Sequence, residues 1–149
     1  MTRVTKRTRI AAGLAAAASA TIAGVVASAQ LMGPSSSQTP YVLPVVPAVK
    51  TSSILTVGDS IGGYKLVGLP DGLGAFDNGN GTFTVLMNHE VGSTAGLTHA
   101  HGSKGSFVSK WVINKSTLSV ISGSDLMQRV FPWDTANQRS FATHSTFAF

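Results

Sequence analysis

The chain has 149 residues, a formal net charge of +5 at pH 7 and no cysteine. The lack of cysteine excludes a disulfide framework and any metal site built from thiolates. Four of the eleven lysines and arginines lie in residues 1–29, which leaves seven basic residues against six acidic ones. Since the rest of the chain has no basic patch interleaved with aromatic residues, the sequence does not support nucleic-acid binding.

Residues 1–29 have the three parts of a secretory signal peptide. Basic residues between Arg3 and Arg9 precede an uncharged, alanine-rich run over 10–26, and Ala27-Ser28-Ala29 fits the small-x-small cleavage rule. The alternative is a retained membrane anchor, because the apolar run approaches spanning length. We favour export with cleavage after Ala29, which predicts a secreted protein, extracellular or periplasmic, without a membrane partner after cleavage.

The remaining residues divide by composition into a linker and a β-domain. Residues 30–52 contain four prolines and a run of three serines, so we expect an extended linker there. Residues 53–149 carry the short apolar and β-branched runs that are typical of a β-domain. The sequence ends on the apolar run 145–149 without a polar tail, and we expect the domain to be the N-terminal part of a longer protein.

The stretch 71–90 predicts a β-hairpin. Its first arm, Leu73–Phe76, enters the run Asp77-Asn78-Gly79-Asn80-Gly81, whose residues tolerate the positive φ angles of tight turns. The return arm, Thr82–Asn88, is rich in β-forming residues and alternates in polarity. One face of this arm carries Phe83, Val85 and Met87.

The other strand candidates are short apolar runs bounded by turn residues. Ser106–Asn114 is the clearest of them, and Pro70-Asp71-Gly72 predicts a turn that ends a strand over 64–69. No segment after the signal helix shows a sustained helical period, so we predict an all-β fold, either a sandwich or a propeller. The remaining candidates are 54–57, 117–121 and, as a short strand or a single helical turn, 124–130.

Asn88-His89-Glu90 is the first candidate site. In a strand, Asn88 and Glu90 point to one side, roughly 7 Å apart, and His89 points to the other, toward the Phe83 face. A carboxylate and an amide oxygen on one side suit a hard cation such as calcium. The alternative is a cluster that hydrogen-bonds a neighbouring loop at the end of the strand.

His99-Ala100-His101 is the second candidate, within a loop predicted over 91–105. Two imidazoles spaced by one residue project to the same side of an extended segment, which permits joint metal or phosphate binding. Lys104 adds a positive charge nearby, so His99, His101 and Lys104 are candidate substrate-binding residues. The alternative is a polar loop with exposed histidines. His144 stands alone and has no assigned role.

Two other motifs are better explained as turns. Gly58-Asp59-Ser60 matches the start of a catalytic block in one lipase and esterase class, but the Asp-x-x-His pair of that class is absent. Asp77–Gly81 lacks the spacing and the closing glutamate of an EF-hand loop. Both runs consist of residues that favour tight turns.

The runs Gly63–Gly68, Pro70–Ala75 and Asn78–Glu90 resemble exported bacterial proteins related to PhoX-type alkaline phosphatases, and the likeness covers residues 54–126. The resemblance implies a β-propeller whose central pocket binds calcium, with iron in the true phosphatases, and phosphate esters as substrates. By position it implies that Glu90 is a metal ligand, with Asn88 or His89 beside it and Asp71 near the same rim.

The chain departs from that family in two ways. The phosphatases use a cysteine for iron, so we do not expect this chain to assemble iron by itself. They also take acidic ligands from later blades. A blade needs about 40 to 45 residues, so the β-domain corresponds to about two to three blades of a partial propeller.

The sequence therefore predicts the N-terminal portion of a secreted, calcium-dependent phosphoesterase whose ligand is a small phosphate ester. In such an enzyme the cation polarises the phosphoryl oxygen. The alternative is a secreted propeller-type binding or surface protein without catalysis, or an inactive remnant. Further acidic ligands in later blades would distinguish the enzyme from the binding protein.

Overall fold

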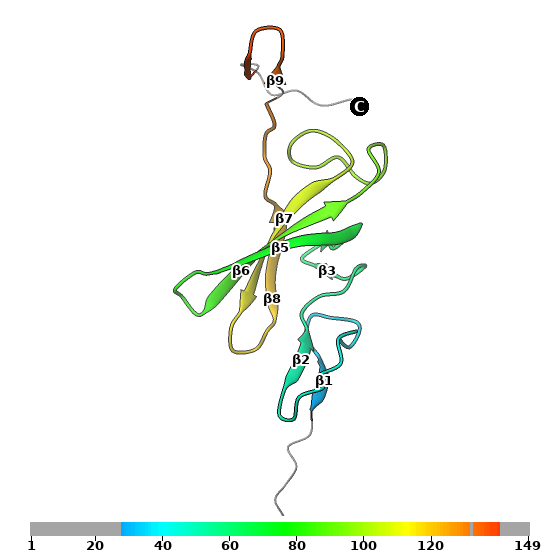
Figure 1. The fold of residues 1–149 in the computed structure, drawn as a ribbon, viewed down its shortest axis with the longest axis vertical. Helices are drawn as coiled ribbons and strands as arrows, with labels where there is room; N and C mark the ends of the chain where they lie inside the picture. The colour runs from blue at the N-terminus through cyan, green and yellow to red at the C-terminus, as the bar shows by residue number, and fades with distance from the viewer. Residues whose placement is uncertain (1–27, 132, 141–149) are drawn as a thin grey trace, which may run out of the picture.

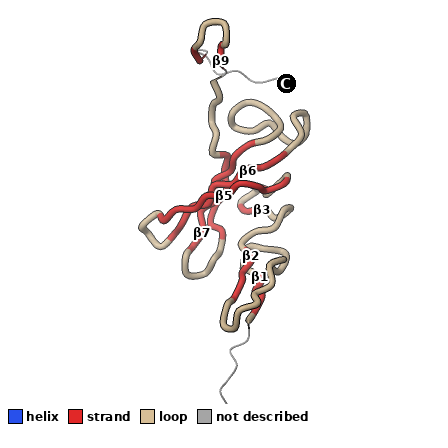
Figure 2. The backbone as a smooth tube through the Cα atoms, viewed as in Figure 1, coloured by secondary structure: helices blue, strands red, loops and turns tan. Residues whose placement is uncertain are grey.

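The computed structural model describes residues 28–131 and 133–140, and this part of the chain consists of strands and loops alone (Figure 2). The prediction of an all-β fold is confirmed for these residues. Most of the predicted signal peptide, His144 and the apolar run 145–149 lie outside them. In the part described, no helix has the length and apolarity needed to cross a membrane.

The centre of the fold is a four-stranded antiparallel sheet in the order β5-β6-β7-β8 (Figure 1). Each strand pairs with the next one in sequence, so the sheet is a meander. Its strands are β5 (Leu69–Asp77), β6 (Thr82–Glu90), β7 (Phe107–Asn114) and β8 (Val120–Asp125). The predicted hairpin of β5 and β6 is confirmed, with Phe76 opposite Thr84 and Asp77 opposite Phe83.

The run between β5 and β6 is a turn, as predicted. Gly79 and Gly81 both have positive φ angles, of 73° and 81°. Asp77 Oδ1 accepts a hydrogen bond of 2.8 Å from Gly79 N, and the same carboxylate forms an exposed ion pair with Lys115. The acidic group of this turn is therefore engaged in holding the hairpin tip together.

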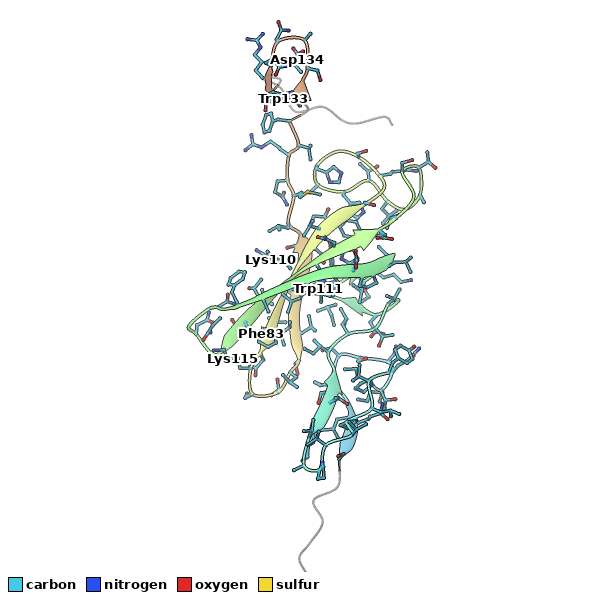
Figure 3. All side chains as sticks on the ribbon, viewed as in Figure 1. Phe83, Lys110, Trp111, Lys115, Trp133 and Asp134 are labelled. Atoms are coloured by element: carbon cyan, nitrogen blue, oxygen red, sulfur yellow. The ribbon has the colours of Figure 1, made fainter. Side chains whose placement is uncertain are left out.

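The core lies on one face of β6 and β7, and Trp111 stands at its centre (Figure 3). The buried cluster consists of Leu66, Trp111, Ile113 and Val120. The predicted faces are confirmed, because alternate residues of β7 are buried and the predicted face of β6 packs against the cluster. The β7 residues in question are Phe107, Ser109, Trp111 and Ile113, and those of β6 are Phe83, Val85 and Met87.

The predicted turn at Pro70-Asp71-Gly72 is wrong. These residues lie inside β5, where the register with β6 shifts between Pro70 and Leu73 as in a β-bulge. Proline fits because β5 is the edge strand of the sheet, and an edge strand tolerates a residue without an N–H. The predicted strand 64–69 is correspondingly reduced to β4 (Tyr64–Lys65), which pairs with β3 (Ser60–Ile61).

The segment predicted as a linker carries strand structure at both ends. β1 (Ala29–Met32) pairs in parallel with β2 (Lys50–Ser53), whereas the strand expected over 54–57 is not present. Two serines of the segment bond to the domain. Ser36 Oγ lies 2.7 Å from Thr56 Oγ1, and Ser35 Oγ accepts a hydrogen bond of 2.9 Å from Val120 N. These bonds attach the segment to Thr56 and to Val120, the first residue of β8.

Two smaller features complete the fold. Asp59 Oδ2 accepts hydrogen bonds from Thr56 N and Ser37 N, so Gly58-Asp59-Ser60 begins with a turn, as predicted. β8 includes the first two residues of the stretch 124–130, where a strand or helical turn was expected, and residues 126–131 contain no strand. A short hairpin follows, formed by β9 (Trp133–Asp134) and β10 (Arg139–Ser140), and Figure 3 places it away from the sheet.

Candidate functional site

The β5 bulge brings Asp71 beside Asn88 and Glu90. All three side chains line one groove of about 300 Å³, which we call the acidic groove. Leu69 pairs with Glu90 and Pro70 with His89, so Asp71 enters the bulge directly opposite this end of β6. All four residues that the sequence proposed as metal ligands, His89 included, therefore line this groove, although the sequence assigned Asp71 to a turn.

Asn88 and Glu90 are exposed and His89 between them is buried, as the strand alternation predicted. A Cβ atom added at Gly72 would lie 2.9 Å from Asn88 Nδ2, so the amide lies directly over the bulge. Among the described residues, no hydrogen bond or ion pair engages the side chains of Asp71, Asn88 or Glu90. Their oxygens are available to a ligand.

His89 belongs to a different set of contacts. Its Nδ1 lies 2.7 Å from Val67 O and its Nε2 lies 2.6 Å from Ser109 Oγ. Because a carbonyl can only accept, Nδ1 carries the proton and Nε2 accepts from the serine hydroxyl. Trp111 Nε1 donates to the same Ser109 oxygen over 2.7 Å. Both ring nitrogens of His89 are thus used inside the core, and burial lowers the pKa of this histidine despite the bond to Val67.

His101 and Lys104 line a second hollow of about 370 Å³, which we call the basic pocket. The basic pocket and the acidic groove share Ser106 and Met127 in their walls, so they are neighbours. His101 is 6% exposed, and its Nδ1 has no hydrogen-bond partner among the described residues. A buried nitrogen without a partner costs about 1–3 kcal/mol.

His99 does not share the pocket of His101. Its ring stacks on Phe107 with the centroids 3.7 Å apart, and His89 stacks on Phe107 at 4.2 Å. The His99 and His101 rings are nearly parallel, with their centroids 6.0 Å apart. The two histidines that the sequence grouped together therefore face different surroundings.

Asp125, at the end of β8, holds His99 in place. His99 Nδ1 lies 3.1 and 3.2 Å from the two carboxylate oxygens, and Ala100 N donates to Oδ2 over 2.7 Å. Tyr64 Oη donates to Oδ1 over 2.5 Å. Burial raises the pKa of Asp125, but the hydrogen bonds from Tyr64, Ala100 and His99 outweigh it, so the pKa lies below its ordinary value. Burial and the neighbouring carboxylate raise the pKa of Tyr64.

Sequence reasoning missed Asp125 as the partner of His99, and Tyr64 as a further partner of Asp125. Tyr64 and Asp125 lie 61 residues apart, and neither belongs to a recognisable motif. The sequence offered one signal for Asp125, because it is one of only six acidic residues and comes at the end of an alternating run.

In the described part of the chain, no group of three His, Asp or Glu side chains is arranged to hold a metal. No family model, curated protein or solved structure matches the chain.

Proposed function

We propose that this chain is a secreted, calcium-binding β-protein of the phosphoesterase type, with Asp71, Asn88 and Glu90 as its cation ligands. The observation that carries the proposal is the convergence of these three side chains on the acidic groove. Carboxylate and amide oxygens are the ligands that calcium prefers. Two carboxylates and an amide oxygen fit part of a calcium shell, and the exposed groove leaves room for water or substrate oxygens.

The neighbouring basic pocket supports a phosphate ester as the ligand. A phosphate group at the shared wall of the two hollows would have the cation ligands on one side and Lys104 with His101 on the other. Lysine binds phosphate as a point charge. A bound cation would supply polarisation of the phosphoryl oxygen. The meander of four antiparallel strands is the arrangement of a propeller blade, which supports the likeness to PhoX-type proteins.

A non-catalytic binding protein is the second candidate. It is favoured by His89, whose two ring nitrogens are already bonded to Val67 and Ser109 and so offer no general base. It is also favoured by the small number of acidic ligands in the described residues. In this candidate the acidic groove holds calcium and the protein recognises a phosphorylated molecule without cleaving it.

The test is calorimetric titration of the purified chain with calcium, followed by an assay with p-nitrophenyl phosphate. We expect Glu90→Gln and Asp71→Asn each to weaken calcium binding at least tenfold, since each removes one charged ligand. Asp134→Asn is the matched control, because its carboxylate caps the β9–β10 turn, in a hairpin that lies away from the sheet (Figure 3), and does not line the groove. Unchanged calcium affinity in Glu90→Gln would rule out the site, and calcium binding without calcium-dependent turnover would favour the second candidate.

A further inference from the structure

We propose that the pocket around His99 binds a small organic carboxylate, such as a single-ring or short-chain acid. This pocket has a volume of about 510 Å³ and lies between β4, the loop 91–105 and the end of β8. Pockets for small molecules span about 300–1,000 Å³. The acidic groove and the His99 pocket are separate, with Phe107 in the wall of each.

The wall of the pocket suits the apolar body of such an acid. Phe107 is buried and forms part of the wall, together with three aliphatic residues and three glycines. At Gly68, with a φ of 73°, an added Cβ would lie 2.7 Å from Glu90 O, so no larger residue fits. The aliphatic residues are Val67, Val91 and Leu97.

The polar end of the pocket is the His99 imidazole. Asp125 holds its Nδ1, and stacking on Phe107 fixes the plane of the ring. Its Nε2 makes no hydrogen bond to any residue that the structure describes. A histidine fixed on one side by a carboxylate presents its other nitrogen to a ligand in a defined direction.

The charges in the pocket favour an anion. Lys65 lies in the wall and has no ion pair within residues 28–131 and 133–140. The one carboxylate, Asp125, is already satisfied by Tyr64, Ala100 and His99. A ligand carboxylate would therefore accept from Lys65 and from Nε2 of a protonated His99, whereas a ligand amine would find no free carboxylate.

A ligand carboxylate needs a donor at Nε2 of His99. With the Nδ1 proton directed at Asp125, Nε2 of a neutral His99 can only accept, so a donor to the ligand requires the cationic ring. The other titratable groups that face His99 are Asp125, Tyr64 and Lys65 in the pocket, His101 alongside, and His89 across Phe107.

The experiment is calorimetric titration of the full chain with benzoate, with benzyl alcohol and benzylamine as comparison ligands. We expect benzoate to bind in preference to both. His99→Phe preserves the stacked ring and should weaken binding about tenfold, the loss of one charge-assisted hydrogen bond. Lys65→Gln should weaken it several-fold.

Lys110→Gln is the control, because Lys110 is exposed on β7 outside this pocket and should leave benzoate affinity unchanged. If His99→Phe does not fold, the Lys65→Gln variant and the two comparison ligands still test the proposal. Equal affinity for benzoate and benzyl alcohol would overturn the proposal. Benzoate binding should persist in EDTA, because it does not depend on calcium. A negative result for the calcium site would therefore not contradict this proposal.

Discussion

Tyr64 Oη donates a hydrogen bond of 2.5 Å to Asp125 Oδ1, and so joins β4 to the last residue of β8. The same carboxylate accepts from Ala100 N and His99 Nδ1 in the long loop. One side chain thus connects three parts of the chain that are distant in sequence. The stability of this end of the sheet should therefore depend on Asp125.

Asp125→Asn should lower the free energy of unfolding by about 2–4 kcal/mol. The amide group of asparagine would point a donor at groups that are themselves donors, and hydrogen bonds to a charged acceptor are worth about 1.5–3 kcal/mol. Urea denaturation followed by circular dichroism measures the change. Asp77→Asn is the control, because its ion pair with Lys115 is exposed to solvent and contributes little to stability. Equal losses in the two variants would contradict this role for Asp125.

Stability should fall in two stages as the pH decreases. The folded-state pKa of His89 lies below the ordinary value of 6.5, so the unfolded chain binds this proton first and stability declines from that pH downward. The pKa of Asp125 also lies below its ordinary value of 3.8, so its contribution is present above that value and is lost as the pH falls through the folded pKa. Denaturation curves at a series of pH values would reveal both stages. In His89→Gln the first stage should disappear.

Ser109→Ala should cost about 2–4 kcal/mol, because it leaves two buried nitrogens without a partner, His89 Nε2 and Trp111 Nε1. Ser109 is fully buried, so water cannot replace its hydroxyl. Ser122→Ala, at an exposed position of β8, should change the stability by less than about 0.5 kcal/mol. Thermal unfolding of the two variants side by side would separate these outcomes. If Ser109→Ala has only a small effect, His89 and Trp111 must find other hydrogen-bond partners when the hydroxyl is removed.

Gly123→Ala should be among the most damaging single changes in β8. An added Cβ would lie 2.3 Å from Trp111 Cζ3 and 2.6 Å from Tyr64 Cδ1, and overpacking of a core costs about 1–3 kcal/mol or more. Gly74→Ala in β5 is the matched control, since nothing lies within 4 Å of its added Cβ. That variant should be neutral or slightly stabilising. Chemical denaturation measures the unfolding free energy of both variants. Similar losses of stability in the two would mean that the Trp111 ring does not lie against Gly123.

Part of the fold could be predicted from sequence because it depends on local pattern. The alternation of β7 indicated its buried face, that of β6 indicated the face that packs against the core, and the turn residues of 77–81 indicated the hairpin. Pro70–Gly72 was mistaken for a turn, because proline and glycine mark a β-bulge on an edge strand as well as they mark a turn. Only the position of β5 in the sheet distinguishes the two.

The candidate site was predictable where its residues lie on one strand, as Asn88 and Glu90 do. It was not predictable where distant segments meet. Asp125 reaches the loop 91–105 and β4 only after the meander has formed, and periodicity carries no signal for such contacts. The pairing of β1 with β2 was missed for the same reason, since a parallel pair is joined by a long connection.

The two tryptophans of the chain differ in solvent exposure, so their fluorescence reports on two different parts of the structure. Trp111 is 2% exposed, with its indole N–H bonded to Ser109, whereas Trp133 is 58% exposed in the β9–β10 hairpin (Figure 3). Acrylamide should quench the fluorescence of Trp133 readily and leave the blue-shifted emission of Trp111 intact. Because Ser109 also bonds to His89, the Trp111 emission should report the integrity of the buried network in real time, without any attached label.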